Sequence, residues 1–224
     1  HWIGTAKTDE ERSTYRMMEE LYHQLGTHEP QVIGITGARG TPVSLERAQG
    51  VSDYIAENGR GRQLQLAFSN WGTPDAESKA NVLLARYPQT NIIWAANYSM
   101  ALGALRAVKA HGASVLVGST AAAPKAVPSM AEQGMAVSLG SHFFIGAWAM
   151  VLLHDYHHGL DFAAHGGTRQ KLDHLYVITP DNASRYYQVV YDQTDALDFS
   201  VFSKYLHPSP GSYTFSLAPL MRQK

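Results

Sequence analysis

The segment NIIWAANYSMALGALRAVKAHG, residues 91–112, contains the structural unit from which most of the chain is built. Residues 91–96 form a short and mostly apolar run, which is the pattern of a buried strand. Asn97 follows this run and is a residue type well suited to capping a helix. Residues 98–111 have the composition and length of that helix. The segment therefore predicts a strand that is followed at once by a helix.

This alternation of strands and helices repeats along most of the chain. It predicts an α/β fold, a doubly wound parallel sheet with helices on both faces. After Asp181 the alternation stops and an irregular tail follows. The predicted helix 123–133 is the weakest, because prolines interrupt it. The predicted strands are residues 31–36, 63–69, 91–96, 114–118, 135–139 and 174–179, and the predicted helices are residues 8–25, 41–58, 75–87, 98–111, 123–133 and 143–158.

The composition of the chain excludes several classes of function. Hydrophobic residues make up 45% of the 224 residues, which is enough for a sizeable core, and the formal net charge is -1. Such a balance, without a basic run, gives no bulk attraction to nucleic acid or to an anionic membrane. The chain has no cysteine, which excludes disulfides, thiolate metal sites and a cysteine nucleophile. No apolar stretch reaches the roughly 18–20 residues that a membrane-spanning helix needs.

Candidate binding residues follow the predicted strands, because ligands of parallel sheets lie beyond the carboxyl ends of the strands. Arg47 could give forked hydrogen bonds to hydroxyls or to a carboxylate, although spacing alone favours an ordinary surface arginine. Trp71 could stack on the apolar face of a sugar ring or fill the core. The amide of Asn97 can donate and accept, but it can also cap the helix that follows. Thr120 offers a small hydroxyl that suits either a polar cleft or a cap.

Two further patterns give weaker signals. Gly34, Gly37 and Gly40 could approach a phosphate, but their spacing fits no nucleotide-binding loop and favours a tight turn. His154 and His158 lie four residues apart on a predicted helix and could share a metal ion, but no third ligand is placed. No Gly-x-Ser-x-Gly sequence supports serine-hydrolase chemistry. We therefore expect no metal ion, no cofactor and no enzymatic activity.

Three parts of the chain resemble one known family. They are GTPVSLERAQGV at 40–51, WAANYSMALGALRAVKAHG at 94–112, and VLVGST at 115–120 followed by MAVSLGSHFFIGAWA at 135–149. In order and spacing, over about residues 1–180, they are similar to the type I periplasmic sugar-binding proteins, the ribose-binding family above all. The effector core of LacI-type repressors has the same fold.

The resemblance implies a fold of two similar lobes joined by three crossings, with the ligand in the cleft. Residues 1–4 would end the amino-terminal lobe and form the hinge, and residues 5–139 would form the carboxyl-terminal lobe. Residues 140–172 would be the returning part of the amino-terminal lobe. Residues 173–224 would add a final strand and an extended tail to the carboxyl-terminal lobe. The early part of the amino-terminal lobe would then precede His1.

An incomplete amino-terminal lobe has a structural consequence for the predicted helix 143–158. Its side chains Phe144, Trp148, Val151 and Leu152 are too apolar for a solvated helix. We expect part of this apolar face to be exposed, because it should pack on the preceding segment of the family.

The resemblance also carries over ligand contacts. Arg47 matches the cleft arginine of the family, Trp71 its stacking aromatic residue and Asn97 its cleft asparagine. Two positions depart from the pattern: Thr120 stands where sugar binders commonly have an aspartate, and Gly140 stands where they have a glutamine. The predicted ligand site consists of Arg47, Trp71, Asn97, Thr120 and His142.

The function that the resemblance implies is a periplasmic receptor for a sugar or sugar-like small polar ligand. It would feed an ABC permease in the membrane and would bind no nucleic acid. A receptor for a membrane sensor kinase and the effector domain of a LacI-type repressor are the alternatives. Because Thr120 replaces the aspartate, we expect weak binding of common pentoses and hexoses. A modified, phosphorylated or acidic sugar-like ligand, or a small signalling molecule, should bind better.

Overall fold

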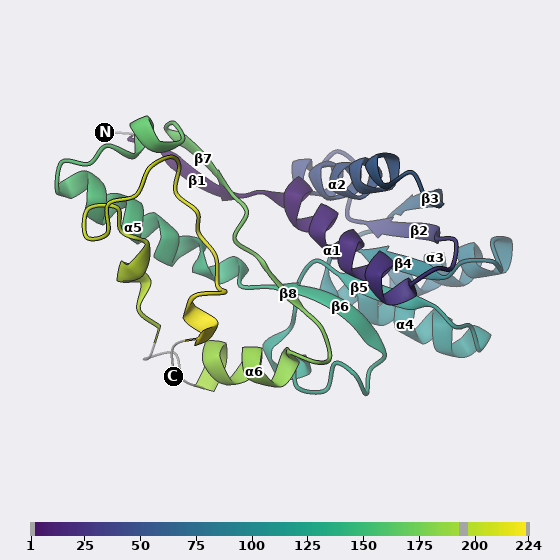
Figure 1. Cartoon of the computed structure of the whole chain (residues 1–224). Coiled ribbons are helices and arrows are strands. Elements are labelled where there is room, and N and C mark those ends of the chain that lie inside the picture. The colour runs from purple at the N-terminus through teal and green to yellow at the C-terminus, as the bar shows by residue number, and fades with distance from the viewer. Residues whose placement is uncertain (1–2, 193–196, 223–224) are drawn as a thin grey trace. The chain divides into compact units, whose positions relative to one another are not determined.

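The chain folds into two units, and the computed structural model describes residues 3–192 and 197–222 (Figure 1). The smaller unit gathers three separate segments of the chain, whereas the larger unit is almost continuous. The smaller, first unit comprises the described parts of His1–Asp9, Ser141–Tyr176 and Gln188–Lys224, and the larger, second unit comprises Glu10–Gly140 and Val177–Tyr187.

A six-stranded sheet forms the centre of the second unit, in the order β3-β2-β4-β5-β6-β8. The pairs β2–β3, β2–β4, β4–β5 and β5–β6 are all parallel. The central strand β4 is buried along its whole length, as a sheet covered on both faces requires. This topology confirms the predicted doubly wound parallel sheet. The strands are β2 Gln31–Thr36, β3 Arg62–Phe68, β4 Ile92–Ala95, β5 Leu116–Ser119, β6 Met135–Gly140 and β8 Tyr176–Ile178.

Helices cover both faces of this sheet. Helix α1 packs against α2 on one face, and α3 packs against α4 on the other (Figure 1). Each helix buries an apolar stripe at helical spacing; in α1 the fully buried residues include Met17, Met18 and Leu21. The short helix α6 belongs to the same unit. The helices are α1 Glu10–Leu25, α2 Pro42–Asn58, α3 Thr73–Arg86, α4 Tyr98–His111 and α6 Ala183–Tyr187.

The weakest helix prediction, residues 123–133, was wrong. That segment forms only a 3-10 turn, Pro124–Ala126, followed by further turns. Pro124 and Pro128 lack the backbone N–H that a continuous helix needs, so the segment cannot form a regular α-helix.

The first unit contains two strands that the sequence did not reveal. Strand β1 (Thr5–Thr8) pairs in parallel with β7 (Arg169–Leu172) in a two-stranded sheet. Helix α5 (Ile145–His157) follows a 3-10 turn, His142–Phe144. The rest of the unit consists of short turns: the 3-10 segments Phe162–His165, Phe199–Phe202 and Leu220–Arg222, and one π-helical turn, Gln188–Asp192.

The boundaries of the units differ from the expected ones in two places. Residues 5–8 belong to the first unit rather than to the carboxyl-terminal lobe, because β1 pairs with β7. The tail was expected on the carboxyl-terminal lobe, but only Val177–Tyr187 joins the second unit. The described residues from Gln188 onward fold into the first unit, because aromatic side chains of the tail pack on α5.

The expectation that Phe144, Trp148, Val151 and Leu152 would be exposed was therefore wrong. All four are buried, and Trp148 is fully so. The tail covers this face: the ring centroids of Phe199, Phe202 and Phe215 lie 4.9, 4.9 and 5.0 Å from that of Trp148.

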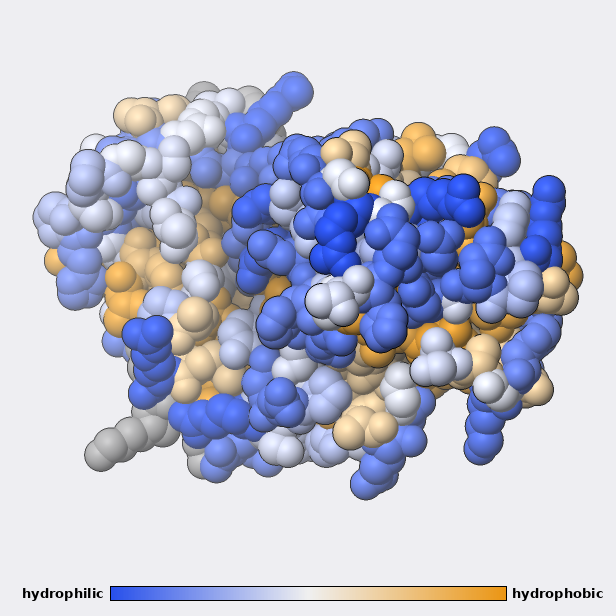
Figure 2. Space-filling model, turned by 45° about the vertical axis from the view of Figure 1, so that its right-hand side comes forward, coloured by the Kyte–Doolittle hydropathy of each residue, from blue (hydrophilic) through white to orange (hydrophobic). Residues whose placement is uncertain are grey.

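A different side of α5 is exposed. The side chains of Met150, Leu153 and Tyr156 are 64%, 43% and 40% exposed, which is unusual for large apolar residues on one helix. An open, mostly apolar groove of about 450 Å³ runs between α5 and the tail segment 199–206. The surface seen in Figure 2 is largely hydrophilic, with hydrophobic patches between the polar side chains.

A buried carboxylate fastens the tail to α5. Asp155 is fully buried, and it accepts hydrogen bonds from Ser203 Oγ at 2.5 Å, Lys204 N at 2.7 Å and Tyr213 Oη at 2.7 Å. His154 Nδ1 lies 3.2 Å from the same carboxylate. Burial alone would raise the pKa of Asp155, but these hydrogen bonds outweigh it and hold the pKa below its usual value.

Candidate functional site

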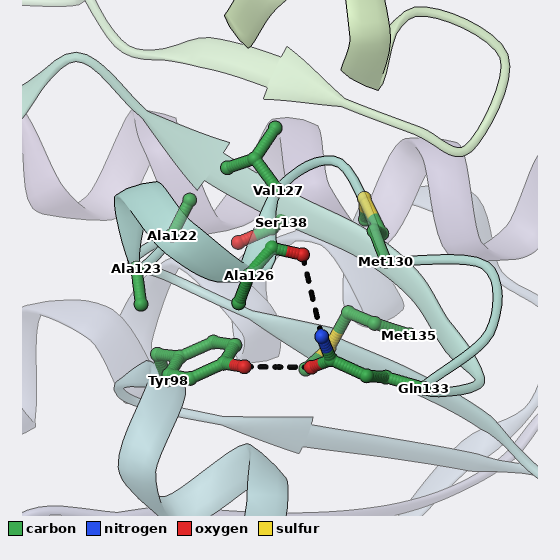
Figure 3. A pocket seen from close by; sticks show the side chains of 9 residues that line it. All are labelled: Tyr98, Ala122, Ala123, Ala126, Val127, Met130, Gln133, Met135 and Ser138. Atoms are coloured by element: carbon green, nitrogen blue, oxygen red, sulfur yellow. Dashed lines mark hydrogen bonds between the residues drawn. The ribbon is translucent and has the colours of Figure 1, made fainter. Parts of the chain in front are cut away.

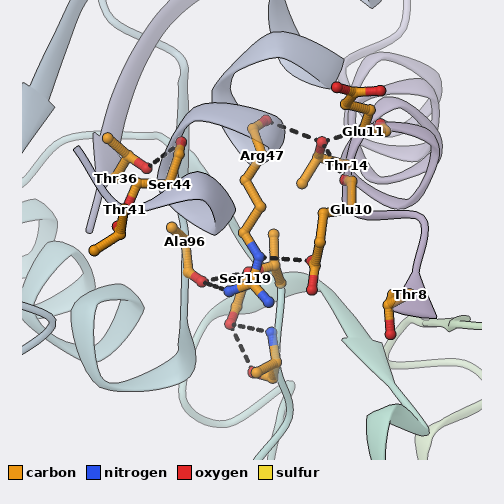
Figure 4. A network of polar contacts seen from close by, with 12 residues as sticks. Thr8, Glu10, Glu11, Thr14, Thr36, Thr41, Ser44, Arg47, Ala96 and Ser119 are labelled. Carbon is orange, nitrogen blue, oxygen red and sulfur yellow. Dashed lines mark hydrogen bonds and ion pairs between the residues drawn. The ribbon is translucent and has the colours of Figure 1, made fainter. Parts of the chain in front are cut away.

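The carbonyl of Ala96, directly after strand β4, accepts hydrogen bonds from two predicted site residues. Figure 4 shows Arg47 at this carbonyl. Arg47 reaches it from α2 through Nη1, and Thr120 reaches it from the end of β5 through Oγ1 at 2.5 Å. The backbone N–H of Ala96 in turn donates to the carbonyl of Ile35 at 2.9 Å. These contacts lie beyond the carboxyl ends of three neighbouring parallel strands, where such sheets hold their ligands.

Arg47 is not the surface arginine that its spacing alone favoured. The residue is 8% exposed, and its Nε donates to Glu10 Oε2 at 2.8 Å. Its backbone carbonyl accepts from Thr14 Oγ1 at 2.9 Å, which ties α2 to α1. A guanidinium has five N–H donors, and the described part of the chain uses two of them. Three donors therefore remain for a ligand.

Glu10 is the site residue that sequence reasoning missed. Its carboxylate lies in the first turn of α1, where the helix dipole stabilises negative charge. The only signal in the sequence was a pair of acidic residues at the start of a helix, which is also an ordinary helix-start pattern. Its partner Arg47 lies 37 positions away, so the pair could not be inferred from spacing.

Asn97 fulfils both of the roles considered for it. Its Oδ1 accepts from Met100 N at 2.7 Å and so caps α4. Its Nδ2 donates to the carbonyl of Trp71 at 3.1 Å, which joins the end of β4 to the loop after β3. One N–H of the amide is left, and the residue is half-buried.

Trp71 sits in an unusual backbone conformation. Its φ is 70°, in the left-handed region that bulky residues rarely adopt. The surrounding loop holds it there: Asn70 Oδ1 accepts from Gly72 N at 3.0 Å, and Asp75 Oδ2 accepts from Asn70 N at 3.1 Å. The hydrogen bond from Lys79 keeps the pKa of Asp75 below its usual value. Backbone strain maintained in this way is often found at ligand-contacting residues.

The indole of Trp71 lies directly on Gly37, just after β2. A Cβ atom at Gly37 would fall 1.9 Å from Trp71 Cζ2, so a side chain at this position would displace the ring. The sequence favoured a tight turn at Gly34, Gly37 and Gly40. At Gly37 the absence of a side chain leaves the space that the indole fills. One face of the Trp71 indole is covered by this contact, and the residue as a whole remains partly exposed.

We predict that Gly37→Ala destabilises the protein by about 1–3 kcal/mol, because the added methyl group overpacks the contact with Trp71. The near-ultraviolet circular dichroism of tryptophan should change as well. Urea unfolding followed by fluorescence measures the first effect. Gly146→Ala is the matched control, because no atom lies within 4 Å of the added Cβ, and it should be neutral or slightly stabilising. Equal stability of the two variants would contradict the contact.

His142 is the one predicted site residue outside the second unit. It belongs to the first unit, where it opens the 3-10 turn that precedes α5. The preceding residue, Ser141, has a φ of 78°. Within the second unit, the structure brings together Arg47, Trp71, Asn97 and Thr120.

A small cavity beside this site is too small for a sugar. It lies between the start of α4, strand β6 and the segment 122–133, and its volume of about 10 Å³ fits one water molecule (Figure 3). Tyr98 Oη donates to Gln133 Oε1 at 2.6 Å across it. Ser138 Oγ is buried there and has no hydrogen-bond partner among the described residues.

Comparison with known protein families supports the family resemblance seen in the sequence. The family model described as the periplasmic binding protein domain matches residues 3–160. The chain belongs to this family. Periplasmic binding proteins are binding proteins rather than enzymes, and the match confirms the resemblance seen in the sequence.

Solved structures of other periplasmic binding proteins agree with this. A periplasmic sugar-binding protein from Pseudomonas fluorescens is 32% identical with a TM-score of 0.81, and the match covers 99% of this chain and 70% of that chain. AraP, an arabinose binding protein from Geobacillus stearothermophilus, shares the fold at 20% identity and a TM-score of 0.71; the match covers 83% of this chain and 66% of AraP.

One curated relative has a different function. The HTH-type transcriptional regulator AscG of Escherichia coli is 26% identical over 132 residues. The match covers 55% of this chain and 38% of the regulator, so the chain spans well under half of that relative.

No helix among residues 3–192 and 197–222 has both the length and the apolar character to cross a membrane. Within the same ranges, no group of three or more histidine, aspartate or glutamate side chains is arranged to hold a metal ion. The rings of His154 and His158 do lie close, with centroids 4.3 Å apart.

Proposed function

We propose that this chain is the ligand-recognising part of a periplasmic receptor for a sugar or sugar-like small polar molecule. The receptor delivers its ligand to an ABC permease and performs no covalent chemistry. The observation that carries the proposal is the meeting of Arg47, Thr120, Asn97 and Trp71 at the carboxyl end of one parallel sheet. The similarity to the Pseudomonas fluorescens sugar-binding protein supports it.

The chemistry of these side chains suits a sugar. Arg47 contributes unused N–H donors that fit neighbouring hydroxyls, and its buried position keeps them oriented. Trp71 offers a flat apolar face for the C–H face of a ring. Asn97 retains one amide N–H close to Arg47 and Trp71. His142, in the first unit, remains a predicted ligand contact that a bound structure would test.

A thermal-shift screen tests this function. The purified protein is heated with D-ribose, L-arabinose, D-allose, D-glucose, D-galactose or myo-inositol. A ligand at one hundred times its dissociation constant stabilises the folded state by about 2.7 kcal/mol, which for a chain of this size is a rise of roughly 5–10 °C. We expect at least one sugar to give such a saturable rise. Absence of any shift across the panel and across uronic acids and sugar phosphates would overturn the proposal.

A second candidate function is the effector-binding core of a transcriptional regulator. The similarity to AscG is the observation that favours it. Both functions use the same ligand site, so binding assays do not separate them. The gene sequence upstream of His1 does: a helix-turn-helix would decide for the regulator, and a signal peptide would exclude it.

A further inference from the structure

The imidazole rings of His154 and His158 lie side by side at the carboxyl-terminal end of α5. Their centroids are 4.3 Å apart, and the helical turn continues through both residues, because His158 N donates to the carbonyl of His154 at 3.2 Å. Both residues are exposed to solvent. Residues four positions apart on a helix share one face, and histidines at this spacing can bind the same metal ion.

Hydrogen bonds fix the same tautomer in both rings. His158 Nδ1 lies 2.8 Å from the carbonyl of His154, which can only accept, so this Nδ1 carries the hydrogen. His154 Nδ1 lies 3.2 Å from the carboxylate of Asp155, whose pKa stays below its usual value despite burial. That carboxylate is ionised at neutral pH and also only accepts. In each neutral ring the lone pair is therefore on Nε2, which has no hydrogen-bond partner among the described residues.

The carboxylate of Asp155 favours a cation at His154. It is fully buried, and the three donors from the tail that hold it are neutral groups. Within the described ranges no lysine or arginine pairs with it, since the ammonium of Lys204 donates to Ser209 instead. A carboxylate that accepts from the other nitrogen of a histidine is the usual outer partner in metal sites, where it orients the ring and makes it a better ligand.

The tail holds the second ring of the pair. The ring of His158 stacks on that of Tyr205, with centroids 4.5 Å apart and an angle of 27° between the planes. The ring of His154 lies 6.0 Å from the same tyrosine. The two imidazoles are thus ordered before any ion binds, which lowers the entropy that binding would otherwise cost.

We propose that His154 and His158 bind one divalent transition-metal ion through their Nε2 atoms. Imidazole ligands suit Zn²⁺, Ni²⁺ and Cu²⁺. Because the described part of the chain places no third histidine or carboxylate ligand there, water completes the coordination shell. This site belongs to the first unit, whereas Arg47 and Trp71 belong to the second, and the inference is independent of the proposed function. It replaces the expectation that the chain binds no metal ion.

Calorimetric titration of the protein, without an affinity tag, with zinc chloride tests the inference. We expect saturable binding of one ion by this pair and no binding of Mg²⁺, which prefers oxygen ligands. The affinity for zinc should fall at least about 10-fold between about pH 7.5 and about pH 5.5, because histidine must lose its proton to bind a metal and ordinarily does so near pH 6.5. Absence of saturable zinc binding, or equally tight binding of Mg²⁺, overturns the inference.

The variants His154→Gln and His158→Gln test the two residues. Each removes one of the two protein ligands, so zinc affinity should fall at least about 10-fold in either variant. His111→Gln is the matched control, because it makes the same change at an exposed histidine in the last turn of α4 and should leave the affinity unaltered. Unchanged affinity in either variant of the pair, or an equal loss in His111→Gln, overturns the inference.

X-ray absorption spectroscopy of the zinc-loaded protein gives a second, structural readout. The spectrum should show two imidazole nitrogens at about 2.0–2.1 Å from the metal, with oxygen atoms in the remaining positions. A zinc ion that is coordinated without two imidazole ligands overturns the inference.

Discussion

Asp155→Ala is expected to destabilise the first unit by about 3–5 kcal/mol. The substitution leaves the donors of Ser203, Tyr213 and the Lys204 backbone without their acceptor in a buried place. Each buried donor left unsatisfied costs about 1–3 kcal/mol, and partial relaxation limits the sum. Chemical denaturation followed by tryptophan fluorescence measures this loss of stability directly, because Trp148 lies in the aromatic cluster that the tail covers.

Asp161→Ala is the control for this variant, since the carboxylate of Asp161 makes one exposed hydrogen bond, to Ala163 N. It should cost no more than about 1 kcal/mol. The pH dependence supplies a second check. The pKa of Asp155 is lower in the folded state, so its contribution is present above the unfolded pKa of about 4 and is lost as pH falls through the folded value. The stability difference between the protein and Asp155→Asn should shrink in that acidic range. A difference that grows there would contradict the assignment.

Arg47→Lys is expected to weaken sugar binding by about 10- to 100-fold although it conserves the charge. A lysine ammonium cannot reproduce the planar fork that bonds Glu10 and Ala96 while also presenting donors to a ligand. The loss of one or two charge-assisted hydrogen bonds, about 1.5–3 kcal/mol, corresponds to that range. Calorimetric titration with the sugar found in the thermal-shift screen measures it.

The control for Arg47→Lys is Arg106→Lys. The side chain of Arg106 is 62% exposed and forms a loose ion pair with Glu77 at 3.5 Å, so its replacement should leave the affinity unaltered. Equal affinity of Arg47→Lys and the unaltered protein would mean that the guanidinium serves only to join α1, α2 and β4.

The sheet of the second unit could be predicted from the sequence because its strands are short apolar runs separated by amphipathic helices. The pattern at residues 91–112 gives the strand, the cap and the helix in the order in which they occur. Strands β1 and β7 could not be found in this way. Their sequences, TAKT and RQKL, carry no apolar run, and each is held by its pairing with the other across more than 150 residues.

The candidate site was predictable in part, because the alternation of strands and helices predicts the parallel sheet whose edge carries it. Each of Arg47, Trp71, Asn97 and Thr120 follows a strand of one parallel sheet, and topology alone brings such positions to one edge. The role of Glu10 could not be predicted from the sequence, because its place in the site depends on the packing of α1 against α2.

The buried face of α5 illustrates the same limit. Its side chains are too apolar for a solvated helix, but the sequence did not show that the chain's own tail covers them, so the expected exposure of this face was wrong. The contact of Trp148 with Phe215 joins positions far apart in the sequence, and no local pattern encodes it.

A crystal structure of the protein with its bound sugar tests the central claim most directly. The account predicts a sugar ring over the exposed face of Trp71, with hydroxyls within hydrogen-bond distance of the Arg47 guanidinium, at the carboxyl end of β4. A sugar bound elsewhere, for instance in the groove between α5 and the tail segment 199–206, with Arg47 and Trp71 untouched, would contradict it.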